Sequence, residues 1–135
     1  SPEKEAQMKS QSFPYTTSAG GAATVYADGS ATPQSAVKAK LYAILYAPGT
    51  TDTGATVTVT CEGTGSKPLL TKATAGTSNL WFYPRDLVHA VADGAALTGT
   101  AGGDRALPVL DGYIKVVIAS GGNVTSGKLI AYYEE

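Results

Sequence analysis

Short β-type runs separated by turn residues follow one another along most of the chain. The clearest is residues 55–61, where valine and cysteine alternate with threonine. A period of two places alternate side chains on opposite faces of a strand, so we predict that the apolar residues face a core and the threonines face solvent. Further strands are predicted at residues 13–17, 22–27, 113–119 and 128–133.

The last two of these runs, residues 113–119 and 128–133, are separated only by a loop rich in Gly, Ser and Asn. We interpret them as a hairpin that closes the sheet. Residues 86–92 are a place for a turn of helix, because Pro84 breaks the strand before them.

Residues 35–47 fit either a helix or a strand. As a helix they would be capped by Ser35 and ended by Pro48 and Gly49. We favour the strand, because the next predicted element is a strand and residues 47–54 form a loop rather than a crossover. The strand would place Val37, Leu41 and Leu45 on one face and Lys38, Lys40, Tyr42, Ile44 and Tyr46 on the other.

About eight short strands without a long helix are typical of an antiparallel β-sandwich or jelly roll. We therefore predict an all-β chain with one β-sandwich or jelly-roll-like domain over residues 13–135. Residues 1–12 lack a periodic pattern and bulky side chains, so we expect an extended N-terminal arm there.

Charge and composition narrow the function. Charged residues make up 16% of the chain, and 10 Lys and Arg face 11 Asp and Glu, for a net charge of −1. This balance argues against a protein that grips nucleic acid, and no apolar run reaches the roughly 18 residues of a membrane helix. The first residues are polar and contain no apolar stretch, so we do not expect them to act as a secretory signal. The single cysteine, Cys61, excludes an intrachain disulfide, fits synthesis in a reducing cytoplasm, and is interpreted as a small buried residue.

Two short motifs look like catalytic or nucleotide-binding signatures. Residues 122–128 have the spacing of a P-loop, but Leu129 offers no hydroxyl to Mg²⁺ and only seven residues follow Lys128. The tetrapeptide D-T-G-A at residues 52–55 matches aspartic proteases, in which a homodimer would supply the second carboxylate. Loop residues rather than an apolar strand lead into Asp52, so we interpret it as a turn residue. A dimeric aspartic protease is kept as a remote alternative.

The only histidine, His89, has no cysteine or second histidine to complete a metal site. We interpret His89 as a structural residue that can form a hydrogen bond with a nearby aspartate, Asp86 or Asp93. We therefore predict that the protein is not an enzyme and has no catalytic residue, no cofactor and no metal.

Trp81, Phe82 and Tyr83 form the densest aromatic cluster. Successive strand residues face opposite sides, so either Phe82 is buried and its neighbours are exposed, or the reverse. An exposed aromatic residue is a candidate contact residue for a protein or a carbohydrate. The pairs Tyr132–Tyr133 and Tyr42–Tyr46 raise the same question. A carbohydrate- or receptor-binding β-sandwich of a phage tail or an adhesin is therefore the alternative function.

The stretch W-F-Y-P-R-D-L-V-H-A-V-A-D-G at residues 81–94 resembles the central part of small head proteins of tailed bacteriophages. Residues 113–122 and 127–132 are similar to their C-terminal hairpin. The resemblance covers residues 36–133 and leaves out the arm.

The resemblance implies a capsid decoration, or cement, protein. Such a protein is a β-sandwich on the outside of an HK97-type shell, where it binds the major capsid protein at capsomer junctions and stabilises the head. We accordingly expect a virion protein on the capsid exterior, made in the host cytoplasm, that self-associates as a dimer or trimer and binds neither nucleic acid nor membrane. The arm, the aromatic cluster and the Gly-rich loop at residues 99–105 supply the candidate interface residues: Ser1, Pro2, Glu3, Lys4, Glu5, Trp81, Tyr83, Arg85 and Arg105.

Overall fold

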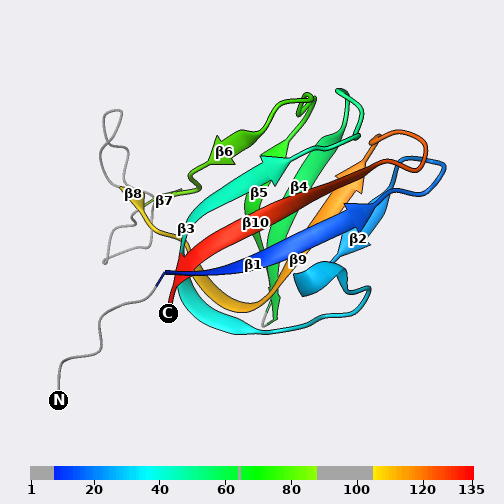
Figure 1. The fold of residues 1–135 in the computed structure, drawn as a ribbon. Coiled ribbons are helices and arrows are strands. Elements are labelled where there is room, and N and C mark those ends of the chain that lie inside the picture. The colour runs from blue at the N-terminus through cyan, green and yellow to red at the C-terminus, as the bar shows by residue number, and fades with distance from the viewer. Residues whose placement is uncertain (1–7, 64, 88–104) are drawn as a thin grey trace, which may run out of the picture.

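A computed structural model describes residues 8–63, 65–87 and 105–135 of the chain (Figure 1). These residues form strands, one short 3₁₀ turn and loops, and no α-helix is found among them. The all-β prediction is confirmed. The elements are β1 (Met8–Thr16), β2 (Ala23–Val25), η1 (Ala27–Gly29), β3 (Val37–Ala47), β4 (Thr56–Gly63), β5 (Ser66–Lys72), β6 (Leu80–Phe82), β7 (Asp86–Leu87), β8 (Arg105–Ala106), β9 (Val109–Ala119) and β10 (Ser126–Glu134).

The strands form one antiparallel sheet that folds into two layers. The sheet order is β1-β10-β3-β9-β4-β5, with β2 paired to β9 and β6 paired to β3, while β7 and β8 pair separately. Strand β3 pairs with β9 only through residues 37–40 and with β6 through residues 44–46. Strand β9 then continues along β2 through residues 116–118. The result is a sandwich-like domain with a front layer β1-β10-β3-β6 and a back layer β2-β9-β4-β5, joined where β3 meets β9 (Figure 1).

Gly112 marks the point where β9 passes from one layer to the other. Its φ is +140°, and it pairs with Val37 of β3 on one side and with Gly63 of β4 on the other. A Cβ atom at this position would collide with the backbone carbonyl of Glu62. Only glycine therefore permits the close approach of the two strands here.

A single apolar core fills the space between the layers. In β4 the residues Val57, Val59 and Cys61 are buried, as the alternation predicts, and the threonines between them are partly exposed. The front layer contributes large side chains such as Phe13 and Tyr46. The core is completed by inward residues of the other strands, among them Tyr15, Leu41, Ile44, Leu110, Ile114, Val116, Ile118, Leu129, Ala131 and Tyr133.

Residues 37–47 form a strand, as favoured, but the predicted assignment of its faces is wrong beyond Tyr42. Tyr132 of β10 is opposite Ala43 and Tyr133 is opposite Leu41, so Tyr42 is an extra residue in β3. This β-bulge reverses the alternation. Ile44 and Tyr46 are therefore buried with Leu41, whereas Leu45 lies on the outer face.

The predicted hairpin of the last two strands is also wrong. Strand β10 pairs with β1 and β3, whereas β9 pairs with β4, β3 and β2, so the two strands lie in different layers. The loop between them crosses from back to front, and the buried Thr125 holds it in place. The Thr125 hydroxyl donates to the Gly121 carbonyl at 2.7 Å, and its backbone carbonyl accepts from the Thr17 amide at 2.7 Å.

The sheet begins at Met8 and not at Phe13. Residues 8–12, predicted as part of the arm, pair with β10 as the first half of β1. Their side chains are mostly exposed polar groups, which hides the strand from a search for apolar alternation. Residues 1–7 lie outside the described residues. Within the segment 86–92, Asp86 and Leu87 form strand β7 rather than a helical turn, and residues 88–92 lie outside the described residues.

Two strands of the sandwich, β1 and β5, lie at the ends of the strand order, and each carries a proline. These are Pro14 in β1 and Pro68 in β5. Proline cannot donate a backbone hydrogen bond, and its presence in edge strands opposes the addition of a further strand.

Candidate functional site

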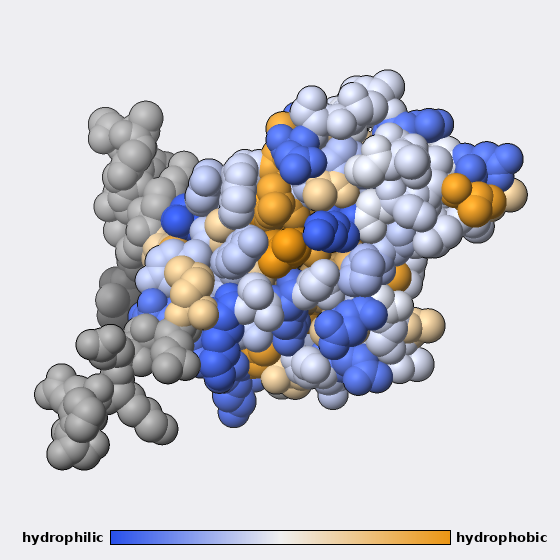
Figure 2. Space-filling view, viewed as in Figure 1, coloured by the Kyte–Doolittle hydropathy of each residue, from blue (hydrophilic) through white to orange (hydrophobic). Residues whose placement is uncertain are grey.

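Four large side chains from three strands share the outer face of the front layer. Leu45 of β3 is opposite Trp81 of β6 on one side and opposite Ile130 of β10 on the other. Tyr132 lies two residues further along β10, on the same face. We call Leu45, Trp81, Ile130 and Tyr132 the front strip. Figure 2, which views the molecule from this side, shows apolar residues gathered in the middle of the face.

The aromatic members of the front strip touch each other. The ring centres of Trp81 and Tyr132 are 5.5 Å apart, with an angle of 31° between the ring planes. Trp81 remains 51% exposed, while its neighbour Phe82 packs against the core. Trp81 and Tyr83 are therefore the exposed members of the cluster, as in the first of the two predicted arrangements, and Phe82 is partly buried. Tyr83 follows β6 and is 62% exposed. Such exposed rings offer a flat apolar platform with polar rims.

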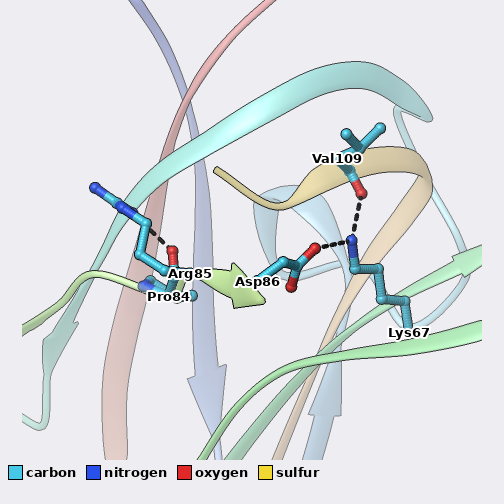
Figure 3. Close-up of polar contacts among 5 residues, drawn as sticks. All are labelled: Lys67, Pro84, Arg85, Asp86 and Val109. Carbon is cyan, nitrogen blue, oxygen red and sulfur yellow. Dashed lines mark hydrogen bonds and ion pairs between the residues drawn. The ribbon is translucent and has the colours of Figure 1, made fainter. Parts of the chain in front are cut away.

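The charged groups around the front strip are mainly cationic. Lys40 and Lys128 alternate with buried residues and are exposed on the outer face. Arg85 follows β6, and its Nη1 donates to the carbonyls of Tyr42 at 3.0 Å and Pro84 at 2.7 Å (the Pro84 contact is drawn in Figure 3). Arg85 therefore fixes the bulge of β3 to the segment after β6.

One carboxylate, Glu134, lies beside these cations. The Tyr42 hydroxyl donates to its Oε2 at 2.8 Å. This hydrogen bond, and the negative charge of Glu134, raise the pKa of the Tyr42 phenol. The Glu134 carboxylate is thus held by a neutral hydroxyl, that of Tyr42.

A second surface lies where the two layers join. A hollow of about 460 Å³ is lined by Lys38, Lys40, Val109, Asp111, Glu134 and Glu135. We call these residues, with Met8 opposite Glu134, the junction end. Met8 and Val109 are both exposed. The first described residue, the C-terminus and the β7–β8 pair all lie at this end of the sandwich (Figure 1).

The β7 strand is tied to the junction end by an ion pair. The Lys67 ammonium of β5 lies 2.6 Å from the Asp86 carboxylate and donates to the Val109 carbonyl at 3.3 Å (Figure 3). Lys9 of β1 forms a further pair with Glu135 at 3.2 Å. The first set of contacts ties β7 and the start of β9 to β5, and the second ties β1 to the residue after β10.

The candidate interface residues predicted from sequence divide among these surfaces. Trp81 is in the front strip, and Tyr83 and Arg85 follow it toward the junction end. Arg105 begins β8, but its side chain lies outside the described residues, as does the segment of residues 1–5.

Of the tyrosine pairs, Tyr132 joins the front strip, whereas Tyr46 and Tyr133 are buried. Leu45 and Ile130 were not predicted as site residues. The strand pairing that unites them with Trp81 joins residues 36 to 85 positions apart in the sequence.

The structure shows where the candidate motifs of the sequence lie. Asp52 is an exposed turn residue whose amide donates to the Gly121 carbonyl at 2.9 Å. Residues 122–128 form a loop and the start of β10, with no helix at their end. Cys61 is buried, and burial raises the pKa of its thiol. His89 lies outside the described residues.

Within residues 8–63, 65–87 and 105–135, no group of three or more His, Cys, Asp and Glu is placed to hold a metal ion. The same residues contain no helix of a length and hydropathy that would cross a membrane. Comparison of the chain with protein-family models, curated proteins and solved structures gives no match.

Proposed function

We propose that this protein is a capsid decoration, or cement, protein of a tailed bacteriophage. It binds the outer surface of the assembled head at capsomer junctions and stabilises it, without enzymatic activity. The resemblance of residues 81–94, 113–122 and 127–132 to small phage head proteins suggests the partner, the major capsid protein of an HK97-type shell. The protein then acts on the capsid exterior, as a dimer or trimer, after synthesis in the host cytoplasm.

The observation that carries the proposal is the concentration of contact features at the junction end. Exposed Met8 and Val109 lie there, next to a hollow lined by charges of both signs. The chain enters the sheet at this end through Met8, so residues 1–7 of the predicted arm (residues 1–12) connect here. An arm that orders on a neighbouring subunit adds contact area at a cost in entropy.

The physical basis of stabilisation is mass action. A protein that binds only the assembled shell shifts the equilibrium toward that shell, by an amount that grows with its concentration. Many weak contacts repeated over a lattice also add through avidity when copies are linked. A rigid sandwich held by one core suits this role, because it transmits force between neighbours without unfolding.

The direct test is binding of the purified protein to expanded capsids that lack it. We expect the protein to sediment with such capsids and to raise their melting temperature. If it neither sediments with the capsids nor raises their melting temperature, the proposal fails.

Two exposed valines provide a matched pair of variants for the contact surface. Val109 at the junction end is 59% exposed, and Val124 in the loop before β10, at the far end of the strands, is 63% exposed. We expect Val109→Ser to weaken capsid binding about threefold to tenfold, the effect of losing one partly buried valine contact. Val124→Ser should bind as the wild type does. Equal losses in both variants would place the contact elsewhere.

A carbohydrate- or receptor-binding role is the second candidate. The contact between Trp81 and Tyr132 favours it, because exposed aromatic platforms of this kind also occur in sugar sites. A glycan array probed with the wild type and with Trp81→Ala separates this role from capsid binding alone. An array without signal dismisses it.

A further inference from the structure

We propose that the front strip is a binding site for an acidic polysaccharide, one whose sugar units carry carboxylates. The inference concerns the front strip, which borders the junction end at Lys40 and Glu134, and it adds a second ligand to the proposed capsid partner. It does not rest on the capsid proposal. It rests on the aromatic platform of the front layer and on the charges around it.

The aromatic platform matches the apolar face of a pyranose ring. Trp81 is half exposed, and Tyr132 lies against it at an angle of 31°, so the two rings form a shallow ledge. Leu45 and Ile130 continue the apolar surface across β3 to β10. Two strand spacings separate β6 from β10, a width of roughly 10 Å. This surface is long enough to contact two adjacent sugar units.

Hydroxyl groups line the far side of the front strip. Ser10 of β1 is opposite Tyr132, and Ser12 is opposite Ile130. Both lie on the same outer face as their partners. Hydroxyls beside an aromatic surface supply the donors and acceptors that orient a sugar.

The charges select a carboxylate-bearing chain over a neutral one. Lys128 lies at one end of the front strip, and Arg85 and Lys40 lie at the other. The nearby carboxylate, Glu134, is opposite Lys40 and accepts from the Tyr42 hydroxyl. Lys9 and Glu135, further along, pair with each other. The described part of this face is therefore cationic although the whole chain has a net charge of −1.

The same charges make a second copy of this chain a poorer occupant. Packing two front layers face to face would bring cationic surfaces together, and like charges opposite each other destabilise an interface. Pairing through the edges at β1 and β5 is opposed by Pro14 and Pro68. An acidic polysaccharide can both stack on the aromatic rings and pair its carboxylates with the cations.

The experiment uses the full chain and a matched pair of probes, trigalacturonate and its fully methyl-esterified form. Trp81 is the only tryptophan, so its fluorescence reports directly on the front strip. We expect saturable quenching by trigalacturonate and at least about fivefold weaker binding of the ester, which lacks the charges. Added salt should weaken binding of the acid but not that of the ester.

Calorimetry on variants tests the aromatic stacking and the cationic charge separately. We expect Trp81→Ala to weaken trigalacturonate binding about tenfold or more, since stacking is lost. Lys128→Gln should weaken it about threefold and reduce its salt dependence. Lys115→Gln, on the outer face of the back layer, is the control and should bind as the wild type does. Each variant is first shown to melt like the wild type.

Several results would overturn the inference. These are the absence of quenching, equal affinity for acid and ester, or an unchanged affinity in Lys128→Gln. A dimer in light scattering that Trp81→Ala dissociates would assign the front strip to a second copy instead. Tighter binding of a single-stranded oligonucleotide would assign it to nucleic acid. Capsid binding stays a separate readout, because Val109→Ser should weaken it and should retain trigalacturonate binding.

Discussion

The Lys67 ammonium and the Asp86 carboxylate lie 2.6 Å apart, and through this pair the edge strand of the back layer holds the segment that follows the front layer (Figure 3). The same ammonium donates to the Val109 carbonyl at the start of β9. Three chain segments thus meet at one side chain. Both partners are more than a third exposed, so solvent screens their attraction and the pair contributes at most about 1 kcal/mol to stability.

We expect Lys67→Met to loosen β7 locally while leaving the sandwich folded. Amide exchange at Asp86 and Leu87 should become faster, and the difference from the wild type should shrink in high salt. Hydrogen exchange followed by mass spectrometry measures both effects. Lys72→Met is the control on the same strand, because the structure shows no ion pair for Lys72 within its described part. Similar exchange in the two variants would show that the ion pair does not hold β7.

Gly112 should be among the least replaceable residues. Its positive φ and the contact that a Cβ would make with the Glu62 carbonyl lead us to expect that Gly112→Ala costs about 3 kcal/mol or more. Gly54→Ala is the matched control, because a Cβ there meets nothing within 4 Å. Urea unfolding of both variants measures the difference. A loss below about 1 kcal/mol for Gly112→Ala would mean that β9 can shift without cost.

The buried hydroxyls of Tyr15 and Thr51 form a hydrogen bond of 2.6 Å between β1 and the loop after β3. Thr51→Val leaves the Tyr15 hydroxyl buried without this partner, so we expect a loss of about 1–3 kcal/mol. The nearby Tyr46 hydroxyl is buried and has no hydrogen-bond partner in the part of the chain that the structure describes, and burial raises the pKa of its phenol. Tyr46→Phe should therefore be neutral or stabilising. Thermal unfolding of the two variants gives the comparison, and a large loss in Tyr46→Phe would show that its hydroxyl has a partner.

Local periodicity predicts the fold class well because most strands keep a strict alternation. In strand β4, threonine alternates with valine or cysteine without interruption, so the sequence alone predicts its buried face. Strand β3 also alternates buried and exposed residues over its first five positions but contains the bulge at Tyr42. A bulge depends on the partner strand, which here comes some 90 residues later in the chain, and no local pattern contains it.

The candidate site was predictable only in part, for a similar reason. Trp81 and Tyr83 stand out as aromatic residues in one short run. Leu45 and Ile130 look like core residues until the register with β6 and β10 places them on the outer face. The wrong hairpin shows the same limit, because a short loop between two strands was taken to mean pairing, whereas this loop connects two layers.

The pair formed by Tyr42 and Glu134 gives a pH dependence. The pKa of Tyr42 is raised above its ordinary value of about 10, first by its hydrogen bond to the carboxylate and then by the charge of Glu134. The stabilisation is therefore fully present below about pH 10 and is lost as the pH rises through the raised pKa.

We expect Glu134→Gln to lower the pKa of Tyr42 toward the ordinary value. The chain has eight tyrosines, so the Tyr42 curve is obtained by subtracting the alkaline absorbance titration of Tyr42→Phe in each background. Identical Tyr42 curves with and without Glu134→Gln would contradict the assignment.

Two truncations separate the arm from the sheet. Removing residues 1–7 leaves every described strand intact, so we expect an unchanged melting temperature and weaker binding to capsids. Removing residues 1–12 also deletes five residues of β1 that pair with β10, and the melting temperature should fall by several degrees. Full capsid binding by the shorter truncation would show that the arm is not part of the contact surface.

The place of β10 between β1 and β3 has a consequence for how the chain folds. This strand is the last of the sheet to leave the ribosome, yet both of its neighbours precede it by many residues. Until it is made, β1 has no strand to pair with and the front layer has a gap, with Phe13 and Tyr46 exposed to water. Folding therefore waits for the final strand and depends on distant contacts, which makes it slow and leaves the nascent chain open to aggregation or chaperone binding.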